Sequence, residues 1–152
     1  MGTPITLTQR LSVADAELLT VNEQLDLTAE ERTRSRHRFV TRLGTPVHLN
    51  LPRGTVLQDG DVLKSDCYCV YVAAKPEPVL TVTSHHAIDL LRAAYHLGNR
   101  HVALEVAATY LRLSPDPVLR SMLEQLGLHV KEEIAPFSPE VGAYRHESHS
   151  HG

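Results

Sequence analysis

The C-terminal end of the chain concentrates the residues with the clearest chemistry. Three of the ten histidines lie in the last seven residues, at His146, His149 and His151. Neutral imidazole binds nickel, copper and zinc, and its ordinary pKa of about 6.5 leaves it mostly neutral at pH 7. The segment predicts metal binding. The alternatives are a polar tail without function or a cloning tag, and the interrupted histidine spacing argues against a tag.

A second candidate lies in the stretch Tyr95–His101, which reads Tyr-His-Leu-Gly-Asn-Arg-His. Gly98 and Asn99 both tolerate left-handed backbone, so we expect a helix to end with Gly98 in the C′ position. His96 and His101 would lie about 140° apart on a continuous helix, which disfavours one ion held by both within a subunit. A dimer with one histidine per subunit at its two-fold axis offers a better geometry. The alternative is that both are ordinary surface or core residues.

Other potential ligands have simpler interpretations. Cys67 and Cys69 share one face of an expected strand and could bind a soft ion, although two small buried side chains explain them as well. The adjacent histidines His85 and His86 lie at an expected helix start and could also bind metal, but the simpler interpretation is that they are exposed polar residues near the helix cap. The histidines interpreted as ordinary polar residues are His37, His48, His85, His86 and His129.

Composition excludes several classes of protein. The net charge of −3 gives no basic stripe for nucleic acid. No apolar run approaches the roughly 20 residues that span a bilayer, so we expect no membrane association. The start of the chain has no signal segment and only two cysteines occur, which predicts a cytoplasmic protein. The four arginines of the stretch 32–38 are interpreted as solvated surface, with a partner patch as the alternative.

The signatures of common enzyme classes are missing. The sequence has no Gly-rich phosphate loop, no His-Glu-x-x-His and no Gly-x-Ser-x-Gly. Its carboxylates are numerous but not clustered, so nothing marks an acid–base pair. We therefore expect a protein that is not an enzyme.

The first half of the chain has the pattern of a β domain. Thr28 and Glu31 have the spacing of a capping box, with a short helical turn after it. Val47, Leu49 and Leu51 alternate with polar residues, as in a half-buried strand. The Pro76 and Pro78 pair is the expected boundary. The strands expected in this half are 5–11, 39–43, 47–51 and 67–74.

The second half alternates strands with two helices. Ser84 is expected to cap the first helix, with Ile88, Leu91 and Tyr95 on one face and Leu90, Ala94 and Leu97 beside it. Ser114 and Pro115 are expected to start the second helix and Gly127 to end it. Its expected buried stripe is Val118, Leu119, Met122, Leu123 and Leu126. The expected strands are 79–83, 102–106, 110–113 and 129–134.

The resulting order β-α-β-β-α-β is ferredoxin-like. The predicted class is therefore α+β, with an N-terminal all-β domain at 1–75 and a ferredoxin-like metal-binding and dimerisation domain at 76–137. A disordered histidine-containing tail is expected at 138–152.

Several motifs resemble one known family, the urease accessory protein UreE, a nickel metallochaperone. The match to its central motif is Ala94–Val102, which contains Gly-Asn-Arg-His. The other segments that are similar to UreE are Glu30–Arg32, Ser35–Arg36, Leu51–Asp61, Val118–Leu123, Ala135–Glu140 and Gly142–Tyr144. The resemblance covers nearly the whole chain. Two departures stand out, since Ser114–Pro117 lacks the extra histidines that some relatives carry and Cys67 replaces an expected glycine.

The resemblance implies a function and a set of partners. It implies a homodimer with His101 at its interface, tail histidines that add ligands, and an N-terminal domain that engages protein partners. The implied partners are the GTPase UreG and apo-urease with its other accessory proteins.

The mechanism that we predict joins these features. Two His101 side chains hold Ni(II) at the dimer axis, His146, His149 and His151 complete the shell, and His96 is a further candidate. Zn(II) or Cu(II) would compete, because imidazole does not discriminate strongly between them. One alternative is a protein-interaction scaffold in a metalloenzyme maturation complex with incidental metal binding. A metal-dependent hydrolase is the last alternative, and it lacks a carboxylate base near Gly98–His101.

Overall fold

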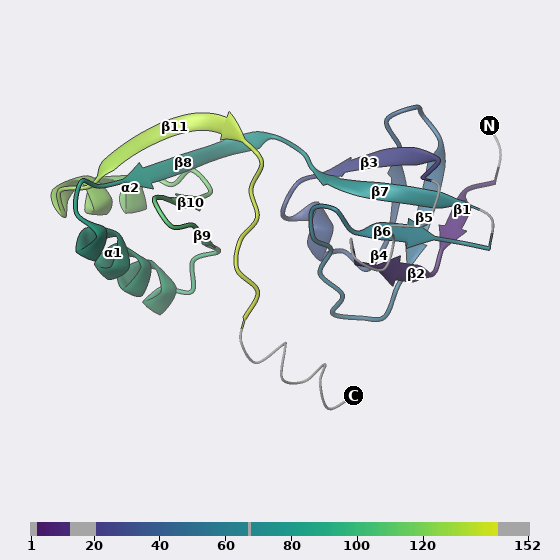
Figure 1. Cartoon of the computed structure of the whole chain (residues 1–152), viewed down its shortest axis with the longest axis horizontal. Coiled ribbons are helices and arrows are strands. Elements are labelled where there is room, and N and C mark those ends of the chain that lie inside the picture. The colour runs from purple at the N-terminus through teal and green to yellow at the C-terminus, as the bar shows by residue number, and fades with distance from the viewer. Residues whose placement is uncertain (1–2, 13–20, 67, 143–152) are drawn as a thin grey trace. The chain divides into compact units, whose positions relative to one another are not determined.

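A computed structural model describes residues 3–12, 21–66 and 68–142 of the chain (Figure 1). The chain divides into two compact units, Met1–Lys75 and Pro76–Gly152. No helix within the described ranges has the length and apolar character needed to cross a membrane.

The first unit is built from two small mixed sheets. One has the strand order β1-β5-β4 and the other the order β2-β6-β7-β3. Strands β1 and β5 pair in parallel, as do β3 and β7, and the remaining neighbours are antiparallel. The elements are β1 (Ile5–Leu7), β2 (Gln9–Leu11), β3 (Glu23–Leu27), the 3₁₀ turn η1 (Glu31–Thr33), β4 (Arg36–Val40), β5 (Pro46–Asn50), β6 (Val62–Lys64) and β7 (Cys69–Ala74).

Alternating apolar residues of these strands make the core of the first unit. Leu25 and Leu27 of β3, Val47 and Leu49 of β5 and Val72 of β7 are all buried. They alternate with exposed or half-buried residues, because successive side chains of a strand point to opposite faces. This pattern confirms the half-buried strand expected at 47–51.

Several expectations for the first unit need correction. The strand expected at 5–11 is two strands in different sheets, β1 and β2, and the strands β3 and β6 were not predicted. The capping box is confirmed, since Thr28 N donates to Glu31 Oε1 at 2.9 Å and Glu31 N donates to Thr28 Oγ1 at 3.2 Å. Arg32 is buried and donates to the Leu27 carbonyl, so the arginine run is not wholly solvated. Cys67 lies outside the described residues, and Cys69 is a half-buried free thiol.

The second unit places two helices on one antiparallel sheet. Its elements follow in the order β-α-β-β-α-β, and the sheet order is β11-β8-β10-β9. Leu80, Val82, Leu97, Leu113 and Leu123 form the centre of the core between the sheet and the helices. The elements are β8 (Glu77–Thr83), α1 (Ala87–Asn99), β9 (Glu105–Val106), β10 (Leu111–Leu113), α2 (Pro117–Gln125) and β11 (His129–Ala135).

The starts of both helices differ from the expectation. The N-cap of α1 is His86 rather than Ser84, although Ser84 Oγ accepts a bond from His86 N at 3.2 Å. The N-cap of α2 is Asp116 rather than Ser114, with Pro117 as the first helical residue. Asp116 Oδ1 accepts from two backbone N–H groups, at 2.9 and 3.0 Å. A carboxylate next to the helix satisfies donors that a more distant serine cannot reach.

Both ends of the stripe expected on α2 are exposed rather than buried. Leu123 is buried, but Val118 is 78% exposed and Leu126 is 48% exposed. A one-sided helix leaves the edges of its apolar stripe in solvent when a single sheet covers it.

Candidate functional site

The C-terminal end of α1 is closed by a histidine in left-handed backbone. Helix α1 continues through Gly98 to Asn99, so the expectation that Gly98 occupies C′ is wrong. His101 takes that position with φ of 57°, and it alone of the non-glycine residues described has a positive φ. Its N–H donates to the Gly98 carbonyl at 3.0 Å, and Val102 N–H donates to the Leu97 carbonyl at 3.1 Å. These two bonds form a Schellman motif with His101 at C′.

The second helix of the same unit ends in the same motif with a glycine. Gly127 has φ of 88°, and its N–H donates to the Glu124 carbonyl at 3.0 Å. Leu128 N–H donates to the Leu123 carbonyl at 3.1 Å. Glycine adopts this backbone without a steric penalty, whereas a Cβ crowds the following carbonyl. His101 therefore stands where local physical chemistry favours glycine, which marks its side chain as a candidate for function.

The two candidate histidines near this helix end have different surroundings. His96 is half-buried in the last turn, and its ring contacts the Tyr95 ring with a centroid distance of 5.4 Å. His101 is exposed beyond the helix. In the part of the chain that the structure describes, no group of three or more His, Cys, Asp or Glu side chains is arranged to hold a metal. The tail candidates His146, His149 and His151 lie outside the described residues.

Helix α1 carries apolar residues on two opposite faces. Leu90, Ala93 and Leu97 are buried against the sheet. Three larger side chains with helical spacing lie on the opposite side and are exposed: Ile88 (50%), Leu91 (66%) and Tyr95 (68%). We call this set the outer face of α1. An exposed apolar stripe of this kind marks an interaction surface more often than chance.

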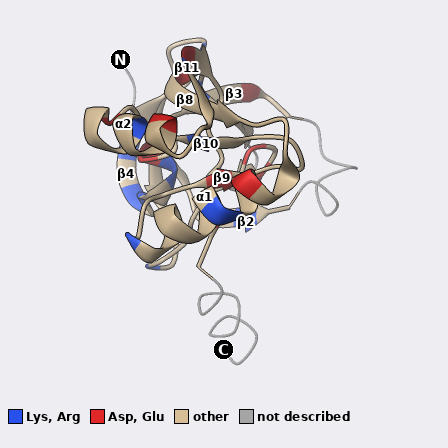
Figure 2. Cartoon of the chain, turned by 90° about the vertical axis from the view of Figure 1, so that its left-hand side faces the viewer, with Lys and Arg blue, Asp and Glu red and all other residues tan. Residues whose placement is uncertain are grey.

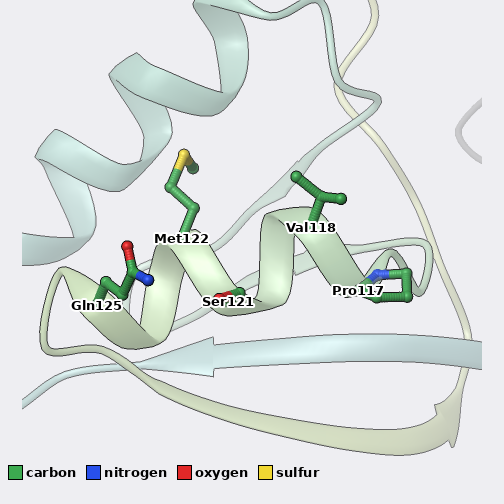
Figure 3. A pocket seen from close by; sticks show the side chains of 5 residues that line it. All are labelled: Pro117, Val118, Ser121, Met122 and Gln125. Atoms are coloured by element: carbon green, nitrogen blue, oxygen red, sulfur yellow. The ribbon is translucent and has the colours of Figure 1, made fainter.

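A groove on α2 adds to the exposed apolar surface of this unit. It has a volume of about 460 Å³ and is lined by Pro117, Val118, Ser121, Met122 and Gln125. Val118 and Met122 project from one side of the helix (Figure 3). The groove is shallow and holds no charged side chain, so it lacks the convergent polar groups typical of a catalytic pocket.

The chain that follows β11 is fixed close to the end of α1. Phe137 is buried, and Ser138 N donates to Glu105 Oε1 at 2.8 Å. Glu140 N donates to the Leu104 carbonyl at 2.8 Å. The expectation of disorder from Ser138 onward is therefore wrong for Ser138–Glu140. No sequence pattern signalled this attachment, because the donors are backbone N–H groups.

The carboxylate that fixes this segment belongs to a polar network on the sheet. Glu105 Oε2 accepts from the Tyr110 hydroxyl at 3.1 Å and lies 3.7 Å from Arg112 Nη1. The hydrogen bond to Glu105 raises the pKa of Tyr110, and burial raises it further. Arg112 also donates to Thr81 Oγ1 at 3.1 Å and pairs with Glu133 at 3.9 Å. The network therefore joins all four strands of the sheet.

Comparison with known proteins agrees with these observations. The chain matches two family models, "UreE urease accessory protein, N-terminal domain" at residues 7–74 and "UreE urease accessory protein, C-terminal domain" at residues 77–152. It is 60% identical to a urease accessory protein UreE of Nostoc punctiforme, over 87% of this chain and 90% of the relative. It is 56% identical to a second Nostoc relative, over 97% and 99% of the two chains. A Microcystis aeruginosa relative is 59% identical, over 84% and 81%.

The relatives carry the name of an accessory protein and not of a catalyst. The matched segments together span both units, including the ends of α1 and α2. The chain therefore belongs to the UreE family of urease accessory proteins.

Proposed function

We propose that this chain is a nickel-binding metallochaperone that delivers Ni(II) for assembly of the urease active site. Two copies form a homodimer in which each contributes His101 to one ion. The second unit is the metal-binding and dimerisation domain, and its strand order β11-β8-β10-β9 supports a ferredoxin-like assignment. Zn(II) and Cu(II) compete for the same imidazoles.

The observation that carries the proposal is the conformation of His101. The residue is exposed and left-handed in a motif that the same unit closes with Gly127 at its other helix. A function for the imidazole explains why glycine does not occupy this position. The rigid hydrogen bonds of the motif also fix the backbone of His101, which pre-orients a ligand.

The outer face of α1 supports a dimer. It runs along the helix from Ile88 to Tyr95 and so leads toward the end that carries His101. A second copy packed on this face would bring the two helix ends together. Gly98 agrees with this arrangement, because a Cβ at this position would meet nothing within 4 Å in its own chain. Its own fold does not require this glycine, whereas close approach of a partner helix would.

The attachment of Ser138–Glu140 supports a role for the tail histidines. Glu140 is bonded to Leu104, three residues after His101. His146 is six residues after Glu140, so an extended chain spans at most about 22 Å between them. The three residues from His101 to Leu104 span at most about 11 Å. The tail from Glu140 is longer than this distance, so a tail histidine can reach His101 of its own chain. We propose that the tail histidines complete the coordination shell and that His96 is an accessory ligand.

The first unit is proposed to engage the protein partners. Strand β4 is the edge of its sheet, and its outer edge is unpaired within the described residues. Arg36 and Arg38 are exposed on this strand, where Figure 2 shows basic residues. An edge of this kind accepts an added strand, and its charge favours an acidic one. The proposed partners are the GTPase UreG and apo-urease with its other accessory proteins.

Titration calorimetry with Ni(II) tests the site. We expect the full chain to bind nickel as a dimer and His101→Ala to lose the site shared by two chains. Deletion of residues 143–152 should reduce affinity but keep the shared ion. Unchanged nickel affinity and stoichiometry in His101→Ala would defeat the assignment.

The alternative is a protein-interaction scaffold without metal transfer. A pull-down with UreG or apo-urease, made with and without nickel and with His101→Ala, separates the two proposals, while Arg36→Glu/Arg38→Glu tests whether the partners bind at β4. The scaffold reading requires that partner binding be independent of nickel and of His101. A chaperone that hands over its ion requires His101 for urease activation in a reconstituted mixture.

A further inference from the structure

A second pair of histidines lies far from His101. The rings of His85 and His129 contact each other edge to face, with centroids 5.5 Å apart and an interplanar angle of 81°. Both residues are exposed, and no hydrogen bond of either imidazole is found within the described residues. We propose that His85 and His129 form a second metal site, for a divalent ion that accepts tetrahedral geometry, with Zn(II) as the representative.

Both backbones at this pair are held by the fold. His129 is the first residue of β11 and pairs with Thr83, the last residue of β8. His85 follows Thr83 by two residues and directly precedes His86, the N-cap of α1. The chain enters His129 from the Schellman motif of Gly127, whose following residue Leu128 is buried. The contact between the two imidazoles therefore does not depend on a long loop, and little chain entropy is lost when they bind one ion.

The ring separation fits a shared ion. A zinc–nitrogen bond of about 2.0–2.1 Å places each ring centroid roughly 3.2 Å from the metal. Two such ligands at an angle between tetrahedral and trigonal have centroids roughly 5 to 5.5 Å apart. A right angle, as in a square-planar site, would bring the centroids to roughly 4.5 Å. The observed 5.5 Å lies at the upper end of the range for one ion shared in tetrahedral or trigonal geometry.

The site would be open and separate from the nickel site. His85 precedes α1 by two residues and His101 follows it by two, and the 13-residue helix is about 20 Å long. No third His, Cys, Asp or Glu joins the pair to make a larger cluster among the described residues. Water or a ligand from another molecule would fill the remaining coordination positions, so the ion would exchange readily.

Zinc binding by the full-length chain tests this proposal. We expect His85→Gln and His129→Gln each to lower the number of Zn(II) ions bound at saturation by one per chain in equilibrium dialysis. The double variant should lose no more than either single variant, because both side chains hold the same ion. Co(II) in place of Zn(II) should show the intense visible absorption of a tetrahedral site, and each variant should lose that contribution.

The matched control is His37→Gln, which removes a histidine of the first unit that contacts Phe39 instead of another histidine. Its zinc stoichiometry should equal that of the unmodified chain. Equal losses in His37→Gln, or no loss in either His85→Gln or His129→Gln, would overturn the site. Circular dichroism of each variant checks that the fold is intact. Nickel binding at His101 should remain in His85→Gln, so failure of this site is distinguishable from failure of the proposed function.

Discussion

The side chain of His101 is held in a backbone conformation that glycine would adopt more easily. A Cβ in left-handed backbone costs about 1–2 kcal/mol, while glycine loses about 0.4–1 kcal/mol through greater freedom in the unfolded chain. We therefore expect His101→Gly to raise the free energy of unfolding by about 0.5–1 kcal/mol. The same variant should lose the nickel ion shared by two chains. Urea unfolding of the metal-free protein and nickel calorimetry measure the two effects.

His101→Ala is the matched control for this prediction. Alanine removes the imidazole but keeps the Cβ in the left-handed position. We expect it to lose nickel without any gain in stability. Equal stability of the glycine and alanine variants would mean that φ at this residue stores no strain.

Asp26 gives the first unit a dependence on pH. Arg42 donates to both carboxylate oxygens of Asp26, at 3.0 and 3.1 Å. These bonds lower the pKa of Asp26 below its ordinary value. A lowered pKa means that the folded state favours the carboxylate, so the stabilisation is present above the unfolded pKa of about 3.9 and is lost as the pH falls through the lower folded value.

We expect Asp26→Asn to lower the free energy of unfolding at pH 7 by less than about 1 kcal/mol, because the pair is partly exposed. The difference from the unmodified chain should shrink as the pH is lowered below about 4. Urea unfolding at several pH values measures it. Arg42→Gln should reproduce the loss, and a constant difference across this pH range would contradict the assignment.

At the scale of elements, helix α1 packs one face into the core of its unit and carries the proposed dimer surface on the opposite face. Gly98 lies inside it, where alanine would be more stable by about 1 kcal/mol and would meet nothing within 4 Å of its own chain. We expect Gly98→Ala to raise the melting temperature of the isolated chain. Overpacking at a close helix contact costs about 1–3 kcal/mol, so self-association should weaken by about tenfold. Sedimentation measures the association of the Gly98→Ala chain, and association equal to that of the unmodified chain would show that Gly98 does not lie in the interface.

The cap of α2 supports a second prediction at this scale. Asp116 accepts from the backbone N–H groups of Val118 and Leu119. We expect Asp116→Ala to lower the free energy of unfolding by about 1 kcal/mol. Ser114→Ala is the control, since the side chain of Ser114 is not the cap, and it should change stability by much less. Chemical unfolding of both variants decides between the two caps.

The sequence predicted which elements form the second unit, and the end of α2 at Gly127, better than the starts of both helices and the end of α1. The glycine predicted that α1 ends with Gly98 at C′. The polar residue Asn99 would then occupy C″, whose side chain normally makes the apolar contact of the Schellman motif. The observed motif instead places Val102 there, and Val102 packs against the core that contains Leu97. Apolar packing therefore decided where the helix ends. Rules that predict helix ends from sequence rely on the conformational freedom of glycine and contain no information about tertiary apolar contacts.

At the scale of the whole molecule, the apolar periodicity of α1 did not reveal that the outer face is exposed. The pattern of Ile88, Leu91 and Tyr95 marks an apolar face, but a single sequence does not tell a core from an interface with another copy. The prolines at 76 and 78 lie where the chain divides into its two compact units. The candidate histidines were named from the sequence and stay predictions, whereas the conformation of His101 and the attachment of Ser138 depend on tertiary structure.

A charge on the outer face tests the proposed dimer. We expect Leu91→Lys to make the chain monomeric with little change in fold, because the side chain is already 66% exposed. Leu43→Lys is the control in the first unit, where Leu43 is 79% exposed. Sedimentation of both variants gives the oligomeric state. A Leu91→Lys protein that still dimerises would place the interface elsewhere.

The two oxygens of Glu105 give this molecule a path for mechanical force. One oxygen holds the backbone of Ser138, and the other is bound by Tyr110 and lies close to Arg112, which reaches across the sheet. A protein that pulled on the end of the chain would load the bond between Glu140 and Leu104 first, this carboxylate second and the strands behind it next. Traction on the C-terminus would thereby be felt at β9, four residues along the chain from the imidazole of His101.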